Sequence, residues 1–530
     1  MTSSSRRDWA NEALAFAALK LRRGEISRRR FMQFTAAFGA AAALPMGGAF
    51  AQTARDTLKF LVGESFWANW HPYNHTAQIG YKIQRNLFSR LVEVQPDMSL
   101  VPGLAESWTQ VDPLTWEFKL RPGVTFHNGA AFTAADVKAS IELASGFVKS
   151  DPALAMTSNW LPTEGIVVDD LTVQLKSATP FGPIINTLAY TDILSAADIA
   201  AGLAALEAKP NGTGAFMLTG DEPNVKTLSR FDGHWRGPAK LATLSWEFIQ
   251  DAQTRLSALL AGQADVIDRV VPDQRALIDG NADVKLISVT APEIQSIWFR
   301  MDKDPLGSNL DLRKAIAWGL DRESMAAIVG GNTLVADSHL ATGIEYRAAQ
   351  SPVYSFDPDK AKAAMAAGGG SVAFELASPT GFYPKAEEIN QLIEQNLNEV
   401  GFEMKLTLLE LGAWIDMLFG ESKPGEAFYG GWGNITRDPD FAVATLLHSP
   451  GAWTGAHDAL SDELINKGKA SSDATERGAI YGQLQSHLWN DLLPSVPILF
   501  SDLSSGYRAN VTGYELYPTA VQDFWPVEIT

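Results

Sequence analysis

Two closely spaced pairs of side chains have the residue types that catalysis or metal binding would need. His71 and His75 stand four residues apart in HPYNH, the spacing at which two imidazoles on one helical face can bind zinc. Pro72 directly follows the first histidine and disfavours the helix that would align the two rings, so we expect no metal site there. Asp438 and Asp440 could act as a carboxylate pair, but aspartate is a favoured N-cap residue. We therefore expect these two to begin the helix that follows.

Other common catalytic and metal-binding signatures are missing from the sequence. The chain has no cysteine, which excludes disulfides, thiolate metal sites and cysteine nucleophiles. It contains no G-x-S-x-G elbow, no phosphate loop and no H-E-x-x-H motif. His127, next to Phe126, is expected to be a surface or loop-facing residue and not a catalytic one. These observations favour a binding protein without cofactor or metal over an enzyme.

The N-terminal segment has the layout of an export signal. Residues 26–34, ISRRRFMQF, precede an alanine-rich apolar run that closes with the small-x-small triplet Ala49-Phe50-Ala51. Residues 27–32 resemble a twin-arginine (Tat) signal, which a translocase reads as an address. We expect Tat export to the periplasm, with residues 1–51 removed and Gln52 first in the mature chain. The alternative is an uncleaved membrane helix, but a span needs about 20 strongly apolar residues and this run is diluted by alanine, glycine and proline.

Removal of the signal leaves a large and strongly acidic protein. Residues 1–51 hold eight Lys and Arg and three Asp and Glu, so their loss changes the formal net charge from −18 to −23. Nucleic acid and anionic lipid are therefore not expected as partners. The 479 residues that remain exceed one core at about 100–200 residues per domain. We expect two lobes, with enough chain left for a subdomain.

Short strands and helices are mixed along the whole chain, which indicates an α/β protein. Residues 116–121 alternate apolar and charged side chains before a Pro-Gly turn, a pattern that predicts a half-buried hairpin with the residues just after the turn. Thr133 with Asp136 three residues later predicts a capping box at the start of a helix. Asp251 and Asp357 likewise stand where helices are expected to begin.

Several stretches in the same order along the chain resemble one protein family. They are VPGLAESWTQVDPLTWEFKLRPGVTFHNGAAFTAADVKAS (101–140), NGTGAFMLTG (211–220) with LSRFDGHWRG (228–237), TRLSALLAGQADV (254–266) and LRKAIAWGLDRESM (312–325). Together they resemble the extracytoplasmic solute-binding proteins of ABC importers, in the peptide-, opine- and nickel-binding family 5, or cluster C. The likeness covers nearly the whole mature chain.

The resemblance implies a two-lobed periplasmic binding protein type II fold with an extra subdomain in the N-terminal lobe. The solute would be enclosed between the lobes when they close. The implied division is lobe 1 at 52–80, 211–291 and 500–530, the extra subdomain at 81–210, and lobe 2 at 292–499. The most specific stretch is mostly scaffold in such proteins, so Trp108, Trp116 and Phe126 are expected in the core.

The resemblance also indicates where ligand-binding residues would lie. In family members the segment before an L-D-P-like tripeptide runs along the ligand, and Trp70-His71-Pro72 occupies that place here. The stretch FYGGWGNITRDPDF resembles the ligand-bearing strand and loop of lobe 2. The candidates from these and neighbouring segments are Phe66, Trp67, Ala68, Tyr383, Trp414, Gly431, Trp432 and Asn434. Simple burial remains the alternative for Trp67 and Trp70.

The ligand class follows less clearly from the resemblance. Peptide-binding members place an aspartate in the lobe 2 loop to pair with the α-amino group, whereas Asn434 and Ile435 occupy the equivalent positions here. Dipeptide binders also use an arginine ahead of the next helix, and LASPTGFYPKAEEINQL has none. A buried charge without a partner is costly, so we expect dipeptides to bind poorly unless Asp438 or Asp440 supplies the charge. A neutral or hydroxyl-rich solute, an opine-like conjugate and a longer peptide all stay open.

The implied function is a periplasmic receptor of an ABC importer. It would capture a small peptide-like, opine-like or saccharide solute and deliver it, as a monomer, to an ABC permease in the inner membrane. The alternatives are a periplasmic hydrolase and a ligand sensor on the same fold. A hydrolase should show a nucleophile and a base within reach of each other, whereas only the neighbouring genes would distinguish a sensor.

Overall fold

The computed structural model describes residues 56–64, 69–74, 78–150, 154, 156–157, 160–419, 425–449 and 453–530. The export signal and the candidates Phe66, Trp67 and Ala68, together with His75, lie outside the described residues. Residues 55–530 form one compact unit. Among the described helices, none combines the length and the apolar character that crossing a bilayer requires.

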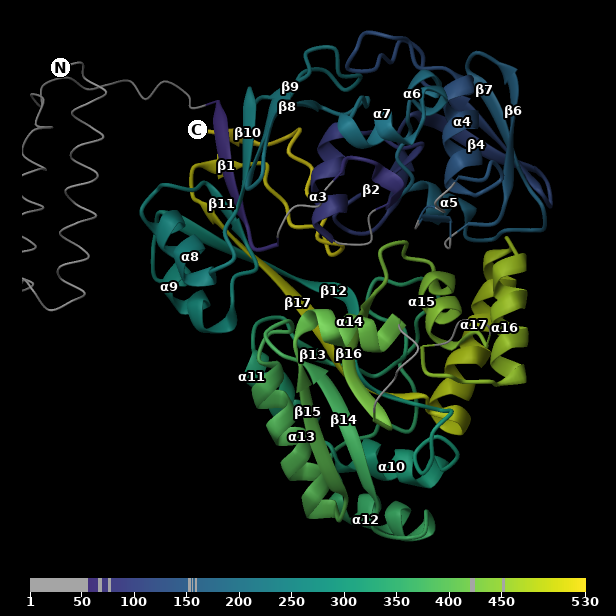
Figure 1. Cartoon of the computed structure of the whole chain (residues 1–530), viewed down its shortest axis with the longest axis vertical. Coiled ribbons are helices and arrows are strands. Elements are labelled where there is room, and N and C mark those ends of the chain that lie inside the picture. The colour runs from purple at the N-terminus through teal and green to yellow at the C-terminus, as the bar shows by residue number, and fades with distance from the viewer. Residues whose placement is uncertain are drawn as a thin grey trace, which may run out of the picture. The chain divides into compact units, whose positions relative to one another are not determined.

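One mixed 11-stranded sheet runs through this unit, in the order β15-β14-β16-β12-β17-β11-β1-β10-β9-β8, with β13 paired to β17. Its strands are β1 (Thr57–Val62), β8 (Phe216–Glu222), β9 (Val225–Arg230), β10 (Thr243–Phe248), β11 (Val266–Asp268), β12 (Val284–Phe299), β13 (Leu334–Val335), β14 (Ala373–Pro379), β15 (Glu403–Leu409), β16 (Ala427–Gly433) and β17 (Ser495–Arg508). The long antiparallel strands β12 and β17 connect the two halves of the sheet (Figure 1). Their pairing is interrupted between Thr290 and Ile294, and its register shifts again between Gln295 and Ser296.

The first half of the sheet has β1 at its centre, parallel to both β10 and β11. Its helices are α3 (Gln78–Leu87), α8 (Ala252–Leu260) and α9 (Arg275–Asp279). Asp251 caps α8 as predicted, since its side chain accepts a hydrogen bond from the Thr254 N–H at 2.7 Å. The loops after β1 and β11 carry charged residues, and they lie at the strand ends where α/β folds commonly bind ligands.

Residues between β1 and β8 form a smaller body with its own four-stranded sheet, in the order β4-β5-β7-β6. Its elements include β2 (Val92–Val94), β3 (Leu100–Pro102), β4 (Ala105–Asp112), β5 (Thr115–Leu120), α4 (Ala134–Ala144), β6 (Thr163–Asp169), β7 (Thr172–Ser177), α5 (Ile184–Leu188), α6 (Ala196–Ala201) and α7 (Leu203–Ala208). The expected hairpin of 116–121 with the residues after its turn is wrong, because β5 pairs with β4 and β7 instead. The predicted capping box is confirmed, with the Thr133 N–H donating to Asp136 Oδ2 at 2.8 Å.

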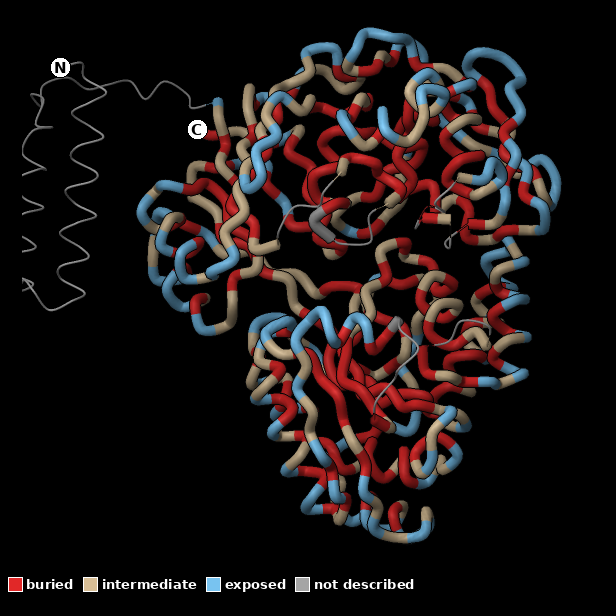
Figure 2. Tube along the Cα trace, in the orientation of Figure 1, coloured by how far each residue is buried: buried red, intermediate tan, exposed pale blue. Residues whose placement is uncertain are grey.

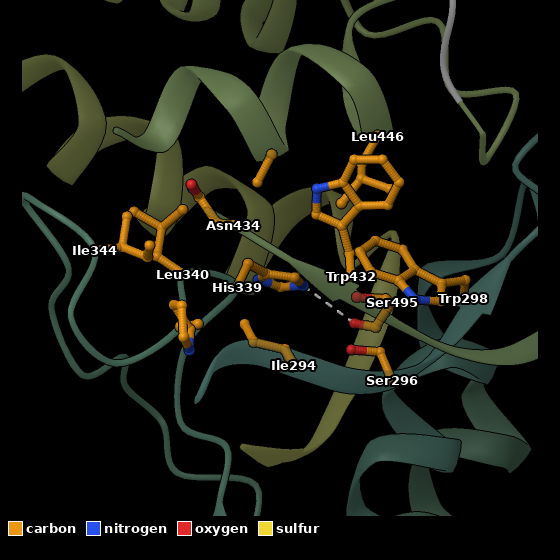
Figure 3. Close-up of a pocket in the computed structure, with 13 residues that line it drawn as sticks. Ile294, Ser296, Trp298, His339, Leu340, Ile344, Trp432, Asn434, Leu446 and Ser495 are labelled. Carbon is orange, nitrogen blue, oxygen red and sulfur yellow. Dashed lines mark hydrogen bonds between the residues drawn. The ribbon is translucent and has the colours of Figure 1, made fainter. Parts of the chain in front are cut away.

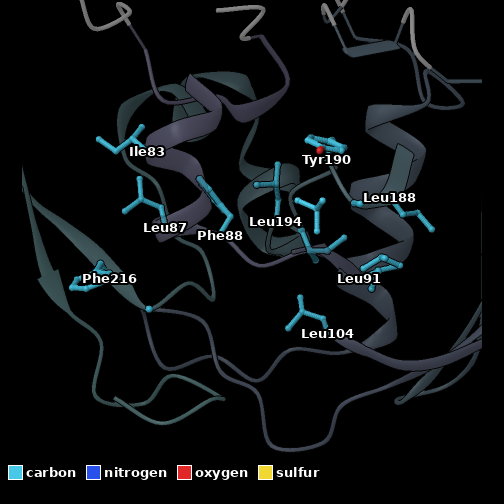
Figure 4. Close-up of a cluster of buried hydrophobic side chains, with 14 of the residues drawn as sticks. Ile83, Leu87, Phe88, Leu91, Leu104, Leu188, Tyr190, Leu194 and Phe216 are labelled. Carbon is cyan, nitrogen blue, oxygen red and sulfur yellow. The ribbon is translucent and has the colours of Figure 1, made fainter. Parts of the chain in front are cut away.

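A single hydrophobic cluster joins this smaller body to the first half of the main sheet. Figure 4 shows part of it, including Ile83 and Leu87 of α3 together with Leu91, Leu104 and Phe216. Phe126 is fully buried in the same cluster, and Trp108 and Trp116 pack against it while partly buried. The prediction of a core position is therefore confirmed for Phe126, whereas Trp108 and Trp116 lie at the edge of the core.

The second half of the sheet is covered on both faces by helices. They are α10 (Leu310–Gly319), α11 (Arg322–Val329), α12 (Pro358–Ala367), α13 (Ala386–Val400), α14 (Leu411–Phe419), α15 (Pro439–Leu447), α16 (Ala459–Ala470) and α17 (Ala474–His487). Because side chains alternate along a strand, Ile297 and Phe299 enter one core with α10 and α13, while Ile294 and Trp298 enter another with α15 and α17. Figure 2 shows the buried sheet between exposed helix surfaces.

Candidate ligand-binding site

Direct contacts hold the two halves of the unit together around the loop that follows β16. Asn186 of α5 donates from Nδ2 to the Thr436 carbonyl at 3.2 Å. At another contact, Lys385 Nζ lies 2.8 Å from Asp273 Oδ2. A narrow pocket at this junction is lined by Pro183 and Thr187 on one side and by residues of the β16–α15 loop and α15 on the other. The predicted ligand loop of lobe 2 thus lies where the halves meet.

The loop after β16 is held in place by its own hydrogen bonds. Asn434 donates from its backbone N–H to the Pro292 carbonyl at 2.7 Å and from Nδ2 to the Asp438 carbonyl at 2.8 Å. Its Oδ1 accepts from the Thr436 N–H at 3.1 Å. The amide of this candidate is therefore used largely to shape the loop, and its side chain is 2 % exposed.

Asp438 and Asp440 have the capping role that the sequence predicts. Asp438 begins α15, with Oδ1 accepting from the Asp440 N–H at 2.9 Å. Both Asp438 oxygens also bind the Arg477 guanidinium, at 2.7 and 2.8 Å. Burial raises the pKa of Asp440 to about 6, although Lys469 Nζ stands 3.7 Å from its Oδ2. Since Asp438 is already paired with Arg477 and Asp440 is buried with Lys469 nearby, neither is well placed to hold a ligand ammonium group.

A small pocket lies under Trp432 on the α15 face of the sheet (Figure 3). It is lined by Pro292, Ile294, Ser296, Trp298, His339, Leu340, Ala341, Ile344, Trp432, Asn434, Ala442, Leu446 and Ser495. About 20 Å³ is open to the centre of a water molecule, which is room for about one or two waters. In this conformation the pocket can take only a small group, such as the end of a ligand side chain.

The pocket is apolar except for a few polar atoms. His339 Nε2 lies 3.2 Å from the Ser495 carbonyl (Figure 3), so Nε2 carries the hydrogen and Nδ1 is left as an acceptor. Burial lowers the pKa of His339 to about 4, which keeps the ring neutral. Among the described residues, His339 Nδ1, Trp432 Nε1, Ser296 Oγ and Ser495 Oγ have no hydrogen-bond partner. One acceptor, one indole donor and two hydroxyls would suit a hydroxyl or amide group.

The candidate aromatic residues pack closely with other rings. Trp432 is partly buried and meets Trp453 edge-on, with ring centroids 4.6 Å apart. Trp414 is 5 % exposed and lies against Gly430, where an added Cβ would stand 2.8 Å from its Cζ2. Tyr383 meets Trp414 at 6.3 Å between centroids. Trp432 and Trp453 thus form one aromatic group on the α15 face of β16. Tyr383 lies beside Gly431 on the other face, so the two groups are separate.

The opposite face of β16 carries a carboxylate that sequence analysis missed. The Gly431 N–H donates to the Tyr383 hydroxyl at 2.7 Å, and a Cβ added at Gly431 would stand 3.1 Å from Glu293 Oε1. Glu293 belongs to β12 and is paired in register with Gly433. Burial raises the pKa of Glu293, while a hydrogen bond from Ser501 acts in the other direction. No sequence signal identified Glu293, because its position depends on the pairing of β12 with β16.

On the other half, the residues that follow the proposed ligand segment are buried. Trp70 is 5 % exposed, and its Nε1 donates to Asp221 Oδ2 at 2.8 Å, so burial is the correct interpretation for this tryptophan. His71 is fully buried and accepts from the Tyr73 N–H at 3.2 Å. Within the described part of the chain, no three His, Asp or Glu side chains gather as a metal site.

Comparison with known proteins gives consistent matches over this architecture. Residues 99–454 match the family model described as bacterial extracellular solute-binding proteins, family 5 Middle. Residues 25–45 match the twin-arginine translocation pathway signal sequence. The chain is 26% identical over 508 residues to the glutathione-binding protein GsiB of Escherichia coli K12, covering 91% of this chain and 96% of that protein.

Solved structures share the fold across most of the chain. The ABC transporter substrate-binding protein CtaP from Listeria monocytogenes superposes with a TM-score of 0.80 at 22% identity, covering 90% of this chain and all of that one. The oligopeptide-binding protein AppA from Bacillus subtilis, solved with a nonapeptide, gives a TM-score of 0.76 at 21% identity with the same coverage. At these identities the superpositions establish the fold, which is the two-lobed type II fold of periplasmic binding proteins.

Proposed function

This chain belongs to family 5 of the bacterial extracellular solute-binding proteins, and we propose that it captures a small peptide-like, opine-like or saccharide solute between two lobes. The family and the Tat signal identify it as a periplasmic solute-binding protein of an ABC importer, exported by the Tat translocase. Its partners are a solute and an ABC permease. The curated relatives are binding proteins and not enzymes, so a periplasmic hydrolase on this fold is disfavoured.

We assign the lobes as the sequence suggests, with lobe 1 at 52–80, 211–291 and 500–530, the extra subdomain at 81–210 and lobe 2 at 292–499. The boundaries at 291 and 499 fall inside β12 and β17, close to the interruption in their pairing. Strands that cross between lobes with broken pairing can bend with little loss of hydrogen bonds, which supports a hinge at this point. The receptor is proposed to act as a monomer.

The observation that carries the ligand proposal is the small pocket at the end of β16, which Trp432 and Asn434 line. We propose that Trp414, Tyr383 and Gly431, which contact one another near the same strand end, also belong to the site. Phe66, Trp67 and Ala68 are proposed to complete the site from lobe 1. Aromatic faces with a few neutral donors and acceptors suit the side chain of a peptide or the ring of a sugar.

Small-angle scattering with and without candidate solutes tests this function. The mature protein should shrink in radius of gyration on binding, and size-exclusion chromatography with light scattering should give the mass of one chain. Glutathione is a suitable first probe because a relative binds it, followed by longer peptides and oligosaccharides. A solute that is chemically converted without lobe closure would contradict the receptor role. Loss of uptake on deletion of the permease would exclude a sensor.

A further inference from the structure

The Glu293 carboxylate lies where the chain crosses between the two proposed lobes. None of the binding roles expected from the sequence involves it. Glu293 lies in β12, within the interval from Thr290 to Ile294 where pairing with β17 is interrupted. Across the sheet its neighbour is Gly433 in β16, and a Cβ added there would stand 3.6 Å from Glu293 Oε2. At Gly431 an added Cβ would stand 3.1 Å from both Glu293 Oε1 and the Tyr383 ring, so little space is free there. Neither glycine has a side chain to contact the carboxylate, and Glu293 stays partly exposed.

Neutral donors orient this carboxylate from the side of the protein core. Ser501 Oγ donates to Glu293 Oε1 at 2.6 Å. Gln295 Nε2 donates to Ser501 Oγ at 2.9 Å, and the Tyr429 hydroxyl in turn donates to Gln295 Oε1. Each donor in this chain points toward Glu293, so the chain holds Oε1 in place and stabilises a negative charge there. Oε2 has no comparable partner among the described side chains.

Basic side chains are near, but none is paired with Glu293. Arg269 follows β11 and is bound to Glu64, while Lys82 is bound to Asp268 at 2.8 Å. In the part of the chain that the structure describes, no basic group lies within ion-pair distance of Glu293. A partly buried carboxylate is costly unless a cation meets it. Burial accordingly raises the pKa of Glu293, and a cation supplied by the solute would offset the same cost while the carboxylate stays charged.

We propose that Glu293 is the anchor for an ammonium group of the solute, replacing the aspartate that the loop after β16 lacks. This inference rests on the proposed function. It narrows the solute to a class that carries a cation, such as the amino end of a peptide or a lysine-type side chain, and it excludes neutral saccharides. Glu293 belongs to β12, which pairs with β16. A negative charge at the end of β16 would therefore be supplied by a residue distant in sequence from the loop after β16. Glu64 and Arg269 lie within electrostatic range of the same place.

Glu293→Gln tests the proposal, because the amide keeps the size of the side chain and can still accept from Ser501. The matched control is Glu403→Gln, an exposed glutamate at the far end of β15. Probes are glutathione and trialanine, each with its N-acetylated form, an N-acetylated peptide ending in lysine, and raffinose as a neutral saccharide. Binding is followed by thermal shift and by calorimetry on the mature protein.

The wild-type protein and the Glu403→Gln control should bind at least one probe that has a free amino group. Neither should bind the N-acetylated form of that probe. Glu293→Gln should bind that probe roughly 30-fold or more weakly, as expected when one partner of a buried charge pair is removed. Binding of only the lysine-ending peptide after acetylation would identify the side-chain ammonium as the source. Without ligand, Glu293→Gln should melt at the same or a higher temperature, because it removes an unpaired charge.

Three results would overturn the inference. They are equal binding of the acetylated forms, unchanged affinity in Glu293→Gln, and a lower melting temperature of the ligand-free variant, which would show that Glu293 belongs to a structural ion pair. A response to raffinose alone would overturn the ammonium anchor while leaving the receptor function intact. Absence of lobe closure with every probe would count against both.

Discussion

Arg477→Met should destabilise lobe 2 and the ligand loop together. Arg477 and Asp438 are 4 % and 1 % exposed at their side chains and form two hydrogen bonds of 2.7 and 2.8 Å. Burial alone would lower the pKa of Arg477, but the facing Asp438 outweighs it and the pKa is raised. Methionine fills a similar volume without charge, so the change leaves the Asp438 carboxylate buried and unpaired.

The size of the effect can be worked out from this geometry. Breaking a buried pair from one side costs about 3–5 kcal/mol. Protonation of the orphaned carboxyl limits the loss, because an aspartate of ordinary pKa takes up a proton at pH 7 at a cost of about 4 kcal/mol. This cost of protonation, which is the upper limit of the loss, falls by about 1.4 kcal/mol for each unit by which the pH is lowered. We therefore expect a loss of about 3–4 kcal/mol at pH 7 that becomes clearly smaller at pH 5.

Urea denaturation at the two pH values measures the effect. Asp438→Asn combined with Arg477→Met should be more stable than Arg477→Met alone, because no buried charge remains. Lys467→Met provides the control, since its partner Glu463 is exposed and such pairs on a helix contribute about 0.3–0.5 kcal/mol. A loss below about 1 kcal/mol, or a loss independent of pH, would refute the reasoning.

Three further predictions follow from other parts of the structure. Trp432→Ala should weaken solute binding by about 1–3 kcal/mol with the fold intact, whereas Trp116→Ala should lower the melting temperature and spare binding. The opposite pattern, in calorimetry and thermal melts, would mean that the ligand strand is misassigned. Burial raises the pKa of Asp440 from 3.8 to about 6, so the folded protein holds an extra proton between these values and its stability should fall by about 3 kcal/mol as pH rises through them. Asp440→Asn should flatten that profile and be the more stable form at pH 7 in urea titrations. Lys385→Gln removes the contact with Asp273 and should weaken solute affinity by less than about fivefold at low salt. In calorimetry at 0.5 M salt that difference should vanish, and a persistent one would indicate another role for the lysine.

The positions at which helices begin could be predicted from the sequence, because they depend on residues close together along the chain. The caps at Thr133, Asp251, Asp357 and Asp438 are confirmed, because an N-cap depends on a side chain and the backbone two or three residues away. The type II fold is likewise as expected from the ordered stretches between 101 and 325.

Features that depend on strand partners could not be predicted in the same way. The alternation over 116–121 correctly indicates a strand, but its partners are β4 and β7, and β7 lies more than fifty residues away. Asn434 was expected to face a ligand, yet its amide mainly bonds within its own loop. The Asn434 amide bonds within the loop because the Asp438 carbonyl lies within its reach. The position of that carbonyl depends on how the loop turns, which the residue types alone do not reveal.

As the proposed ammonium anchor, Glu293 would link the charge of the ligand, which the sequence leaves open, to the closure of the lobes. It stands on β12, which crosses the proposed lobe boundary, where the pairing of that strand with β17 is interrupted. A cation bound there would be held by the hinge itself while the aromatic residues beside β16 and the charged strand ends of lobe 1 approach from either side. Closure would then remove the Glu293 charge from water only when a counter-charge is present, so an ammonium group would favour the closed state and a neutral solute would not. On this proposal, the charge preference and the hinge position would have one physical origin.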